Sequence, residues 1–145
     1  MKLTETMAQK LLSERDRTFM AADIDAYMKL WADDGSIEMG SMQFSGAKNI
    51  RDTIVFAWSM LKALHMETRS FAINDKLILN EFAIVWLNNK TGERSLQTGM
   101  GVLEVNEEGK FISLRDYFES PDTKRKSSFE LPAVKQLLNQ QGESQ

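Results

Sequence analysis

The chain has 145 residues and contains no cysteine, one histidine and two prolines. The absence of cysteine excludes disulfides, thiolate metal sites and cysteine nucleophiles, and a single histidine excludes most zinc chemistry. No run of about 18 apolar residues is free of charged residues, and the N-terminal MKLTETMAQKLLSERDR lacks the apolar core of a signal peptide. We therefore expect a cytoplasmic protein that spans no membrane and uses neither a metal nor another cofactor.

Strong charge of either sign is also missing. The chain has 18 Lys and Arg against 21 Asp and Glu, which gives a formal net charge of −3. This balance offers no broad positive surface for a phosphate backbone, so nucleic acid is not an expected partner. A hydrophobic fraction of 42% with 27% charged residues is typical of a globular protein, and the length fits one domain.

The N-terminal half carries helical periodicity. Apolar residues at spacings of three and four predict helices over Thr6–Ala22, Ile24–Trp31 and Ala47–Leu64, with Asp23 as the N-cap of the second. Between the second and third helices we expect a short strand at Ser36–Met39 and a turn-rich link.

The C-terminal half changes to a period of two. Hairpin-type turns separate four predicted antiparallel strands, which cover His65–Asn74, Leu77–Asn88, Arg94–Val105 and Phe111–Phe118. Helices followed by strands predict an α+β fold, in which three N-terminal helices pack on the concave face of a cone-shaped, curved antiparallel (mixed) sheet. Such an arrangement leaves a cavity between the two layers unless large side chains fill it.

The domain is expected to cover residues 1–123, and residues 124–145 form a polar tail. This tail begins with Lys124-Arg125-Lys126, includes a weakly amphipathic stretch at Leu131–Leu138, and is expected to be partly disordered. Both faces of the predicted strand Leu77–Asn88 are largely apolar. A strand of this kind needs cover on both sides, so we expect a homodimer.

Asp116 is the most informative single residue. Strand alternation places Asp116 on the same face as Ile112, Leu114 and Phe118, which is the more apolar face of the last strand. Desolvation disfavours a charged carboxylate and raises its pKa, which makes it an effective base near neutral pH. Two interpretations are open at this point: a catalytic acid or base, or a structural carboxylate bonded to a nearby amide, hydroxyl or arginine.

Arg15 and two glycines also stand out. Arg15 falls on the apolar stripe of the first predicted helix, either with its head reaching water at the stripe's edge or with its guanidinium inside the cavity. In the second case it could pair with Asp116 and lower the pKa of that acid. Gly99 and Gly101 share one strand face, where they either relieve curvature or leave room for a ligand.

Three segments resemble one known family. DIDAYMKLWADDGSIEMG, FSGAKNIRDTI and GVLEVNEEGKFISLRDYFES are similar to the SnoaL-like and limonene-epoxide-hydrolase-like branch of the nuclear transport factor 2-like superfamily, over about residues 5–121. The resemblance implies a cone-shaped α+β protein, commonly a dimer. Members of this superfamily include polyketide cyclases, epoxide hydrolases, steroid isomerases, dehydratases and non-catalytic adaptors.

The resemblance to the epoxide hydrolases is partial. Asp116, in LRDYF, matches the position of their catalytic aspartate, and similar cyclases use an acid from the same strand region. Phe82 and Ile84 stand where these hydrolases have an arginine and an aspartate. Ile37 and Met39 replace the tyrosine and asparagine that help to hold the water. Epoxide hydrolysis by that mechanism is therefore not expected.

The steroid-isomerase pattern is not matched either. Its base would fall at Met39, its helix tyrosine near Arg15 and its second acid near Gly101. What the resemblance leaves is one carboxylate in a mostly apolar pocket. Such a carboxylate is able to move a proton next to a carbonyl group without a cofactor, as the similar cyclases do.

The sequence therefore predicts a SnoaL-like protein that binds a small hydrophobic carbonyl compound, with Asp116 as general acid or base of a cyclase- or isomerase-type reaction. The alternative is a non-catalytic ligand-binding or dimerisation module of the same fold, because fold alone does not decide function. The predicted ligand-binding residues are Arg15, Met39, Trp58, Phe82, Ile84, Trp86, Gly101 and Leu114.

Overall fold

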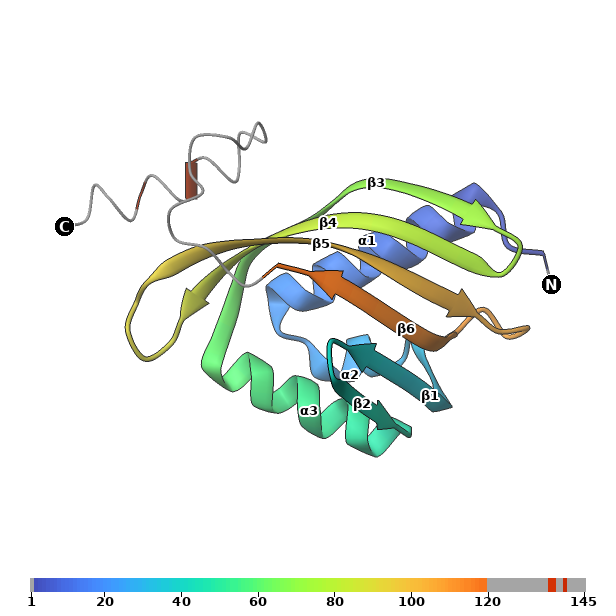
Figure 1. Cartoon of the computed structure of the whole chain (residues 1–145), viewed down its shortest axis with the longest axis horizontal. Helices are drawn as coiled ribbons and strands as arrows, with labels where there is room; N and C mark the ends of the chain where they lie inside the picture. Colours follow the sequence, from blue (N-terminus) through green and yellow to red (C-terminus); the bar gives the residue numbers. More distant parts are fainter. Residues whose placement is uncertain (1, 120–135, 138–139, 141–145) are drawn as a thin grey trace.

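The computed structural model describes residues 2–119, 136–137 and 140. Within residues 2–119, three helices and six strands follow one another in the order α1, α2, β1, β2, α3, β3, β4, β5, β6 (Figure 1). The helices are α1 (Glu5–Ala21), α2 (Ile24–Met28) and α3 (Ala47–Met60). The strands are β1 (Trp31–Met39), β2 (Met42–Ser45), β3 (Leu61–Asn74), β4 (Leu77–Asn88), β5 (Arg94–Val105) and β6 (Phe111–Phe118).

The six strands form one mixed sheet in the order β2-β1-β6-β5-β4-β3. All neighbouring pairs are antiparallel except β1 and β6, which run parallel. The long strands β3, β4 and β5 bend along their length, and the helices lie on one side of the curved sheet (Figure 1). The predicted α+β architecture is confirmed, as are the bounds of β4, β5 and β6.

Local caps explain where the first two helices begin and end. The Thr4 hydroxyl accepts a hydrogen bond from the Met7 amide at the start of α1, and the Asp23 carboxylate accepts one from the Ala26 amide at the start of α2. Ala22 ends α1 in the left-handed conformation, with φ of 51°. These caps place α2 directly after α1, so that Tyr27 faces the sheet and is buried.

The predicted boundaries were wrong at three places. The second helix ends at Met28 instead of Trp31, and the first strand begins at Trp31 instead of Ser36, because Trp31 opens β1 and pairs with Phe111 of β6. The expected link after Met39 contains strand β2, which pairs with β1 through a tight turn at Gly40. The third helix ends at Met60 instead of Leu64, and β3 begins at Leu61 instead of His65, since Leu61 already has extended geometry and pairs with Asn88 at the end of β4.

The main core lies between the helices and the concave face of the sheet. Its fully buried members come from α1, α3 and four strands, and include Ala8, Leu12, Ile37, Ile50, Ile78, Leu103, Val105 and Phe111. Complete burial of large side chains on both layers holds the helices against the sheet, at about 1.5–3 kcal/mol for each large aliphatic or aromatic side chain. The site described below occupies the part of this interface that the core does not fill.

The convex face has a smaller buried cluster. Ala83, Val85 and Leu96 lie on the outer side of β4 and β5, where Leu64 and Leu137 pack against them. The Arg94 guanidinium donates hydrogen bonds to the Leu137 carbonyl oxygen (2.9 Å) and to Gln140 Oε1 (3.3 Å). Part of the face expected to meet a second subunit is thus covered by the chain's own C-terminal segment; residues 124–135 lie outside the described residues. No described helix has the length and apolar character needed to cross a membrane.

Candidate functional site

A cavity of about 170 Å³ remains between the helices and the concave face of the sheet. Its walls are mostly apolar, and four of its rings pack edge to face or at a tilt. Phe19 lies 5.2 Å from Trp58 and 5.4 Å from Tyr27, measured between ring centroids. Trp86 is the fourth ring, 6.4 Å from Phe19. The remaining lining residues are Arg15, Met39, Ile54, Ala57, Met66, Phe82, Ile84, Gln97, Leu103, Phe111, Leu114, Asp116 and Phe118.

Asp116 is the acidic group of this cavity. It lies on β6, opposite Met39 of β1 on one side and Gly101 of β5 on the other. No residue in the described part of the chain donates a hydrogen bond to its carboxylate or forms an ion pair with it. Burial raises the pKa of Asp116 from its ordinary value of 3.8 to about 6, and the positive charge of Arg15 partly opposes this shift.

Gly101 makes room for the Asp116 carboxylate. A Cβ atom at this position would lie 2.7 Å from Asp116 Oδ1, closer than non-bonded atoms tolerate, and 3.3 Å from Asn80 Nδ2. Gly101 does not itself line the cavity, although the sequence placed it among the ligand-binding residues. Its function in the site is therefore spatial, because the missing side chain allows the acid to lie flat against β5.

The substitution Gly101→Ala is expected to displace Asp116 and to destabilise the fold by about 1–3 kcal/mol, the usual cost of overpacking. Urea unfolding measures the free-energy loss, and the carboxyl resonance of Asp116 in an NMR spectrum reports the displacement. Gly92→Ala is the comparison for a destabilised variant without a clash: no described atom lies within 4 Å of the place a Cβ would take there, and the cost comes from its positive φ of 74°. This variant should leave the Asp116 resonance unchanged. An unchanged Asp116 resonance in Gly101→Ala would contradict the proposed displacement.

Arg15 enters the cavity wall from α1 and is almost fully buried. Its Nη1 donates to Asn80 Oδ1 (2.8 Å), and its Nε and Nη2 donate to Asp16 Oδ1 (3.1 and 3.0 Å). The guanidinium carbon lies 5.9 Å from the centroid of the Phe82 ring. Of the two interpretations drawn from the sequence, the structure has the buried guanidinium, but it binds Asp16 and Asn80 in place of Asp116.

Asn80 links this group to the strand that carries Gly101. Asn80 alternates with Phe82 and Ile84 on one face of β4 and is buried there, with its Nδ2 donating to the Gly101 carbonyl oxygen (3.1 Å). The Asn80 side-chain amide therefore binds both the Arg15 guanidinium and β5, the strand that pairs with β6 at Asp116.

Tyr27 is a second polar group of the cavity that the sequence analysis did not select. Its side chain is 2% exposed, and burial raises the pKa of Tyr27 to about 12, with the negative charge of Asp116 adding to the shift and the Trp31 indole opposing it. The phenol therefore stays protonated across the neutral range and keeps a hydrogen to donate. The signal that could have identified it is the helical spacing that puts Tyr27 beside Ile24 and Trp31.

Seven of the eight predicted ligand-binding residues line the cavity: Arg15, Met39, Trp58, Phe82, Ile84, Trp86 and Leu114. Among those the sequence missed, Phe111 is the clearest case. Simple alternation sets it on the face opposite Leu114, but a register irregularity in β5 and β6 between Glu104 and Val105 turns it inward. Within the described residues, no group of three or more His, Asp or Glu side chains is placed to share a metal ion.

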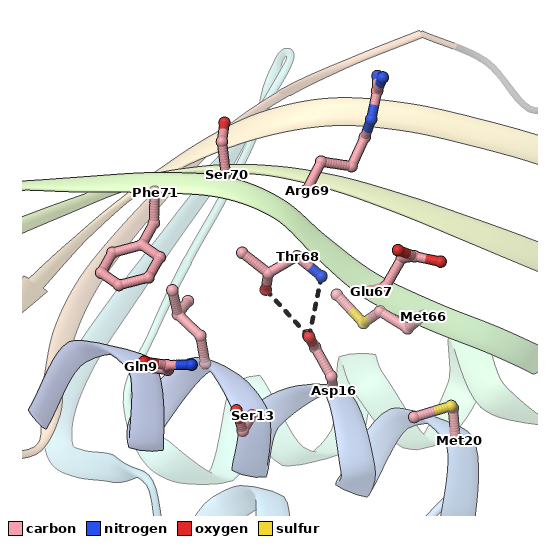
Figure 2. A pocket seen from close by; sticks show the side chains of 11 residues that line it. Gln9, Ser13, Asp16, Met20, Met66, Glu67, Thr68, Arg69, Ser70 and Phe71 are labelled. Atoms are coloured by element: carbon pink, nitrogen blue, oxygen red, sulfur yellow. Dashed lines mark hydrogen bonds between the residues drawn. The ribbon is translucent and has the colours of Figure 1, made fainter. Parts of the chain in front are cut away.

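A second, open depression of about 610 Å³ lies between α1 and the edge strand β3 (Figure 2). Its walls are polar in part, with Gln9, Ser13, Asp16 and Thr68 among the residues that Figure 2 draws. Asp16 reaches from α1 to β3 and accepts hydrogen bonds from the Thr68 amide (3.1 Å) and hydroxyl (2.9 Å). Met66 belongs to both hollows, so the two are separated by a wall about one side chain thick.

No protein-family model matches the chain, and no curated protein matches it. Solved structures do match. An LEH-like epoxide hydrolase from Mycobacterium tuberculosis has 18% identity over 79% of this chain and 84% of its own, with a TM-score of 0.68. A proposed isomerase from Bacillus subtilis has 17% identity over 79% and 87%, with a TM-score of 0.72. A proposed polyketide cyclase from Xanthomonas campestris has 15% identity over 79% and 91%, with a TM-score of 0.68.

SnoaL-like and NTF2-like proteins from two Burkholderia species are also among the matching structures. At identities below 20%, these likenesses establish the fold and leave the activity open. The chain has the nuclear transport factor 2-like fold, and the resemblance drawn from the sequence motifs is confirmed at that level.

Proposed function

We propose that this protein binds a small, uncharged, hydrophobic carbonyl compound in the interior cavity, and that Asp116 acts on it as a cofactor-independent general acid or base. The observation that carries the proposal is a carboxylate with no counter-ion among the described residues, set between aromatic and aliphatic walls. Seven rings line this space. The proposed isomerase and the proposed polyketide cyclase of the same fold support the reaction class.

The cavity volume limits the size of the ligand. An apolar cavity of about 150 Å³ holds one benzene molecule, and the cavity here is about 170 Å³. A compound with one six-membered ring is thus the expected occupant, whereas a fused multi-ring polyketide would require the walls to move. The apolar walls select such a ligand by burial, and polar groups fix its orientation.

The proposed chemistry is proton transfer at the carbon next to the carbonyl group. The Asp116 carboxylate takes this proton, the C–H electron pair forms the carbon–carbon double bond of an enolate, and the negative charge moves to the carbonyl oxygen. The Tyr27 hydroxyl, which stays protonated, is the proposed donor to that oxygen. Asp116 then exchanges this proton with solvent, and delivery of a solvent-derived proton to the same carbon completes an exchange. With a conjugated substrate, delivery to the far carbon of the dienolate moves the double bond and completes an isomerisation.

Deuterium exchange tests this proposal without knowledge of the natural substrate. Cyclohexanone in D₂O exchanges the hydrogens next to its carbonyl group, and NMR follows their loss. Because only the charged carboxylate acts as a base, the protein-dependent rate should rise with pH through the Asp116 pKa of about 6 and then level off. A rate equal to that of buffer alone at every pH, with cyclohexanone bound, would reject the catalytic proposal.

The second candidate is a binding protein without turnover. It is favoured by Phe82 and Ile84, whose apolar side chains occupy the cavity wall where a water-activating arginine and aspartate would be needed for hydrolysis. This candidate predicts that cyclohexanone raises the melting temperature of the protein while the exchange rate stays at the buffer level. The two measurements together separate the candidates.

We also propose that a second copy of the chain packs on the convex face of the sheet. Met100 of β5 and Tyr117 of β6 are paired in register there and are 50% and 62% exposed. Val102 continues the apolar strip along β5, beyond the part that Leu137 covers. Exposed apolar neighbours on a sheet face are typical of an interface, whereas isolated ones are not.

Light scattering is expected to give twice the mass of one chain for the wild type and the mass of one chain for Tyr117→Glu. The new carboxylate would be buried without a partner in the interface, which costs several kcal/mol. Phe56→Glu is the matched control, because Phe56 is 67% exposed but lies on α3, away from the proposed interface. A single-chain mass for the wild type would overturn the proposal.

A further inference from the structure

We propose that Asp16 is a positioning residue for Asp116: it binds the Arg15 guanidinium at the α1–β3 side of the cavity and so leaves the Asp116 carboxylate without a counter-ion. The inference rests on the proposed function, because it explains how an arginine and a free base share one small cavity. It concerns a residue that lies outside the cavity and acts only through Arg15.

Asp16 is saturated with donors. Its Oδ1 accepts hydrogen bonds from Arg15 Nε (3.1 Å) and Nη2 (3.0 Å), and its Oδ2 accepts from the amide and the hydroxyl of Thr68 (Figure 2). The residue is 8% exposed. A buried carboxylate with four donors is held in one position, because turning it away would leave several of these groups unpaired.

The guanidinium of Arg15 forms its hydrogen bonds with Asp16, Thr68 and Asn80. Its Nη2 donates to Thr68 Oγ1 (3.1 Å) in addition to Asp16, and its Nη1 is taken by Asn80. The Phe82 ring lies against the guanidinium. The arginine therefore has a carboxylate and a hydroxyl as partners on the α1–β3 side, and the Asn80 amide as its partner on the side of Gly101 and Asp116. The charges of Arg15 and Asp16 offset each other.

Without Asp16, nothing in the described part of this arrangement would offset the guanidinium charge. An unpaired, buried arginine near an unpaired, half-buried aspartate would be stabilised by pairing with it. Such a pair would hold Asp116 as an anion and remove its basicity. Asp16 thus prevents an Arg15–Asp116 salt bridge, in which Asp116 would have only a structural role.

Two titratable groups face Asp116 across the cavity: Arg15 from α1 and Tyr27 from α2. No other ionisable side chain in the described residues lines this cavity. On the outer side, Asp116 also borders a surface depression that Glu38 and Arg115 line. Because Tyr27 stays neutral through the range in which Asp116 titrates, Arg15 is the charged group of the cavity that acts on Asp116, and Asp16 sets how strongly it acts.

A double-mutant cycle tests the inference. The Asp116 carboxyl carbon, labelled with ¹³C, is titrated by NMR in the wild type, Asp16→Asn, Arg15→Gln and the double variant. In the wild type we expect a midpoint near pH 6. Asp16→Asn should raise the acidity of Asp116 at least tenfold, whereas the same change in the Arg15→Gln background should alter it by less than threefold. A coupling of this size between two residues is the sign that one acts through the other.

Equal shifts in both backgrounds would overturn the inference, since Asp16 would then act on Asp116 by its own charge. Thr68→Val is the second variant: it keeps both charges and removes one donor to Asp16, so it should move the midpoint in the same direction by a smaller amount. An unchanged midpoint in both Asp16→Asn and Thr68→Val would also overturn it. The titration needs no turnover, so its result stands apart from that of the cyclohexanone exchange.

Discussion

Asp116→Asn is expected to slow the protein-dependent exchange of cyclohexanone by about 100- to 10,000-fold, the usual contribution of one general acid or base. The amide has nearly the same shape as the carboxylate but does not accept a proton at neutral pH. Binding of the ketone should be retained, since the aromatic and aliphatic walls are unchanged. The rates are measured by NMR at pH 8, where the wild-type acid is fully charged, and the affinity by calorimetry.

Glu38→Gln is the matched control for this substitution. Glu38 lies next to Met39 on β1, is exposed, and is paired in register with Arg115, one residue from Asp116. Its replacement changes the net charge by the same amount on the opposite face of the sheet, so the exchange rate should stay within about twofold. If cyclohexanone exchanged as fast with Asp116→Asn as with Glu38→Gln, Asp116 would not be the base of the reaction.

The strands and the position of the acid could be predicted because both depend on local alternation. Long strands such as β4 and β5 show a two-residue period in the sequence itself. On β6, the same period places Asp116 on the same face as Leu114. The start of β1 depends instead on pairing with β6, far along the chain, and β2 exists as the partner of β1. Pairing over such a separation leaves no periodic signal in a four-residue strand such as β2.

The environment of Arg15 could not be predicted for a related reason. Periodicity placed the arginine on the buried stripe of α1 and left two interpretations open. Its partners Thr68 and Asn80 are 53 and 65 residues away in sequence, and neither strand pattern indicates which helix residue it meets. Only the register of β3 against β4, with its irregularity between Thr68 and Ser70, brings the three side chains together.

Arg15→Met should lower the free energy of unfolding by about 3–5 kcal/mol, the usual effect of removing one partner from a buried ion pair. The pair is well buried, with side-chain exposures of 8% and 12%. For a domain of this size the loss corresponds to a melting temperature lower by about 10–15 °C. Urea unfolding at constant pH measures it, and methionine keeps most of the apolar length that packs on Phe82.

The double variant Arg15→Met/Asp16→Leu separates the charge effect from a packing effect. In the single variant, the Asp16 carboxylate loses two of its four donors and stays buried without a cation. The double variant removes this charge as well, so it should be more stable than Arg15→Met, because an apolar replacement of both partners is often neutral. If the single and double variants were equally destabilised, the cost would lie in packing at the α1–β3 contact. Arg15 would then contribute to the fold as a long side chain, and the offset of charge that keeps Asp116 free would have no energetic basis.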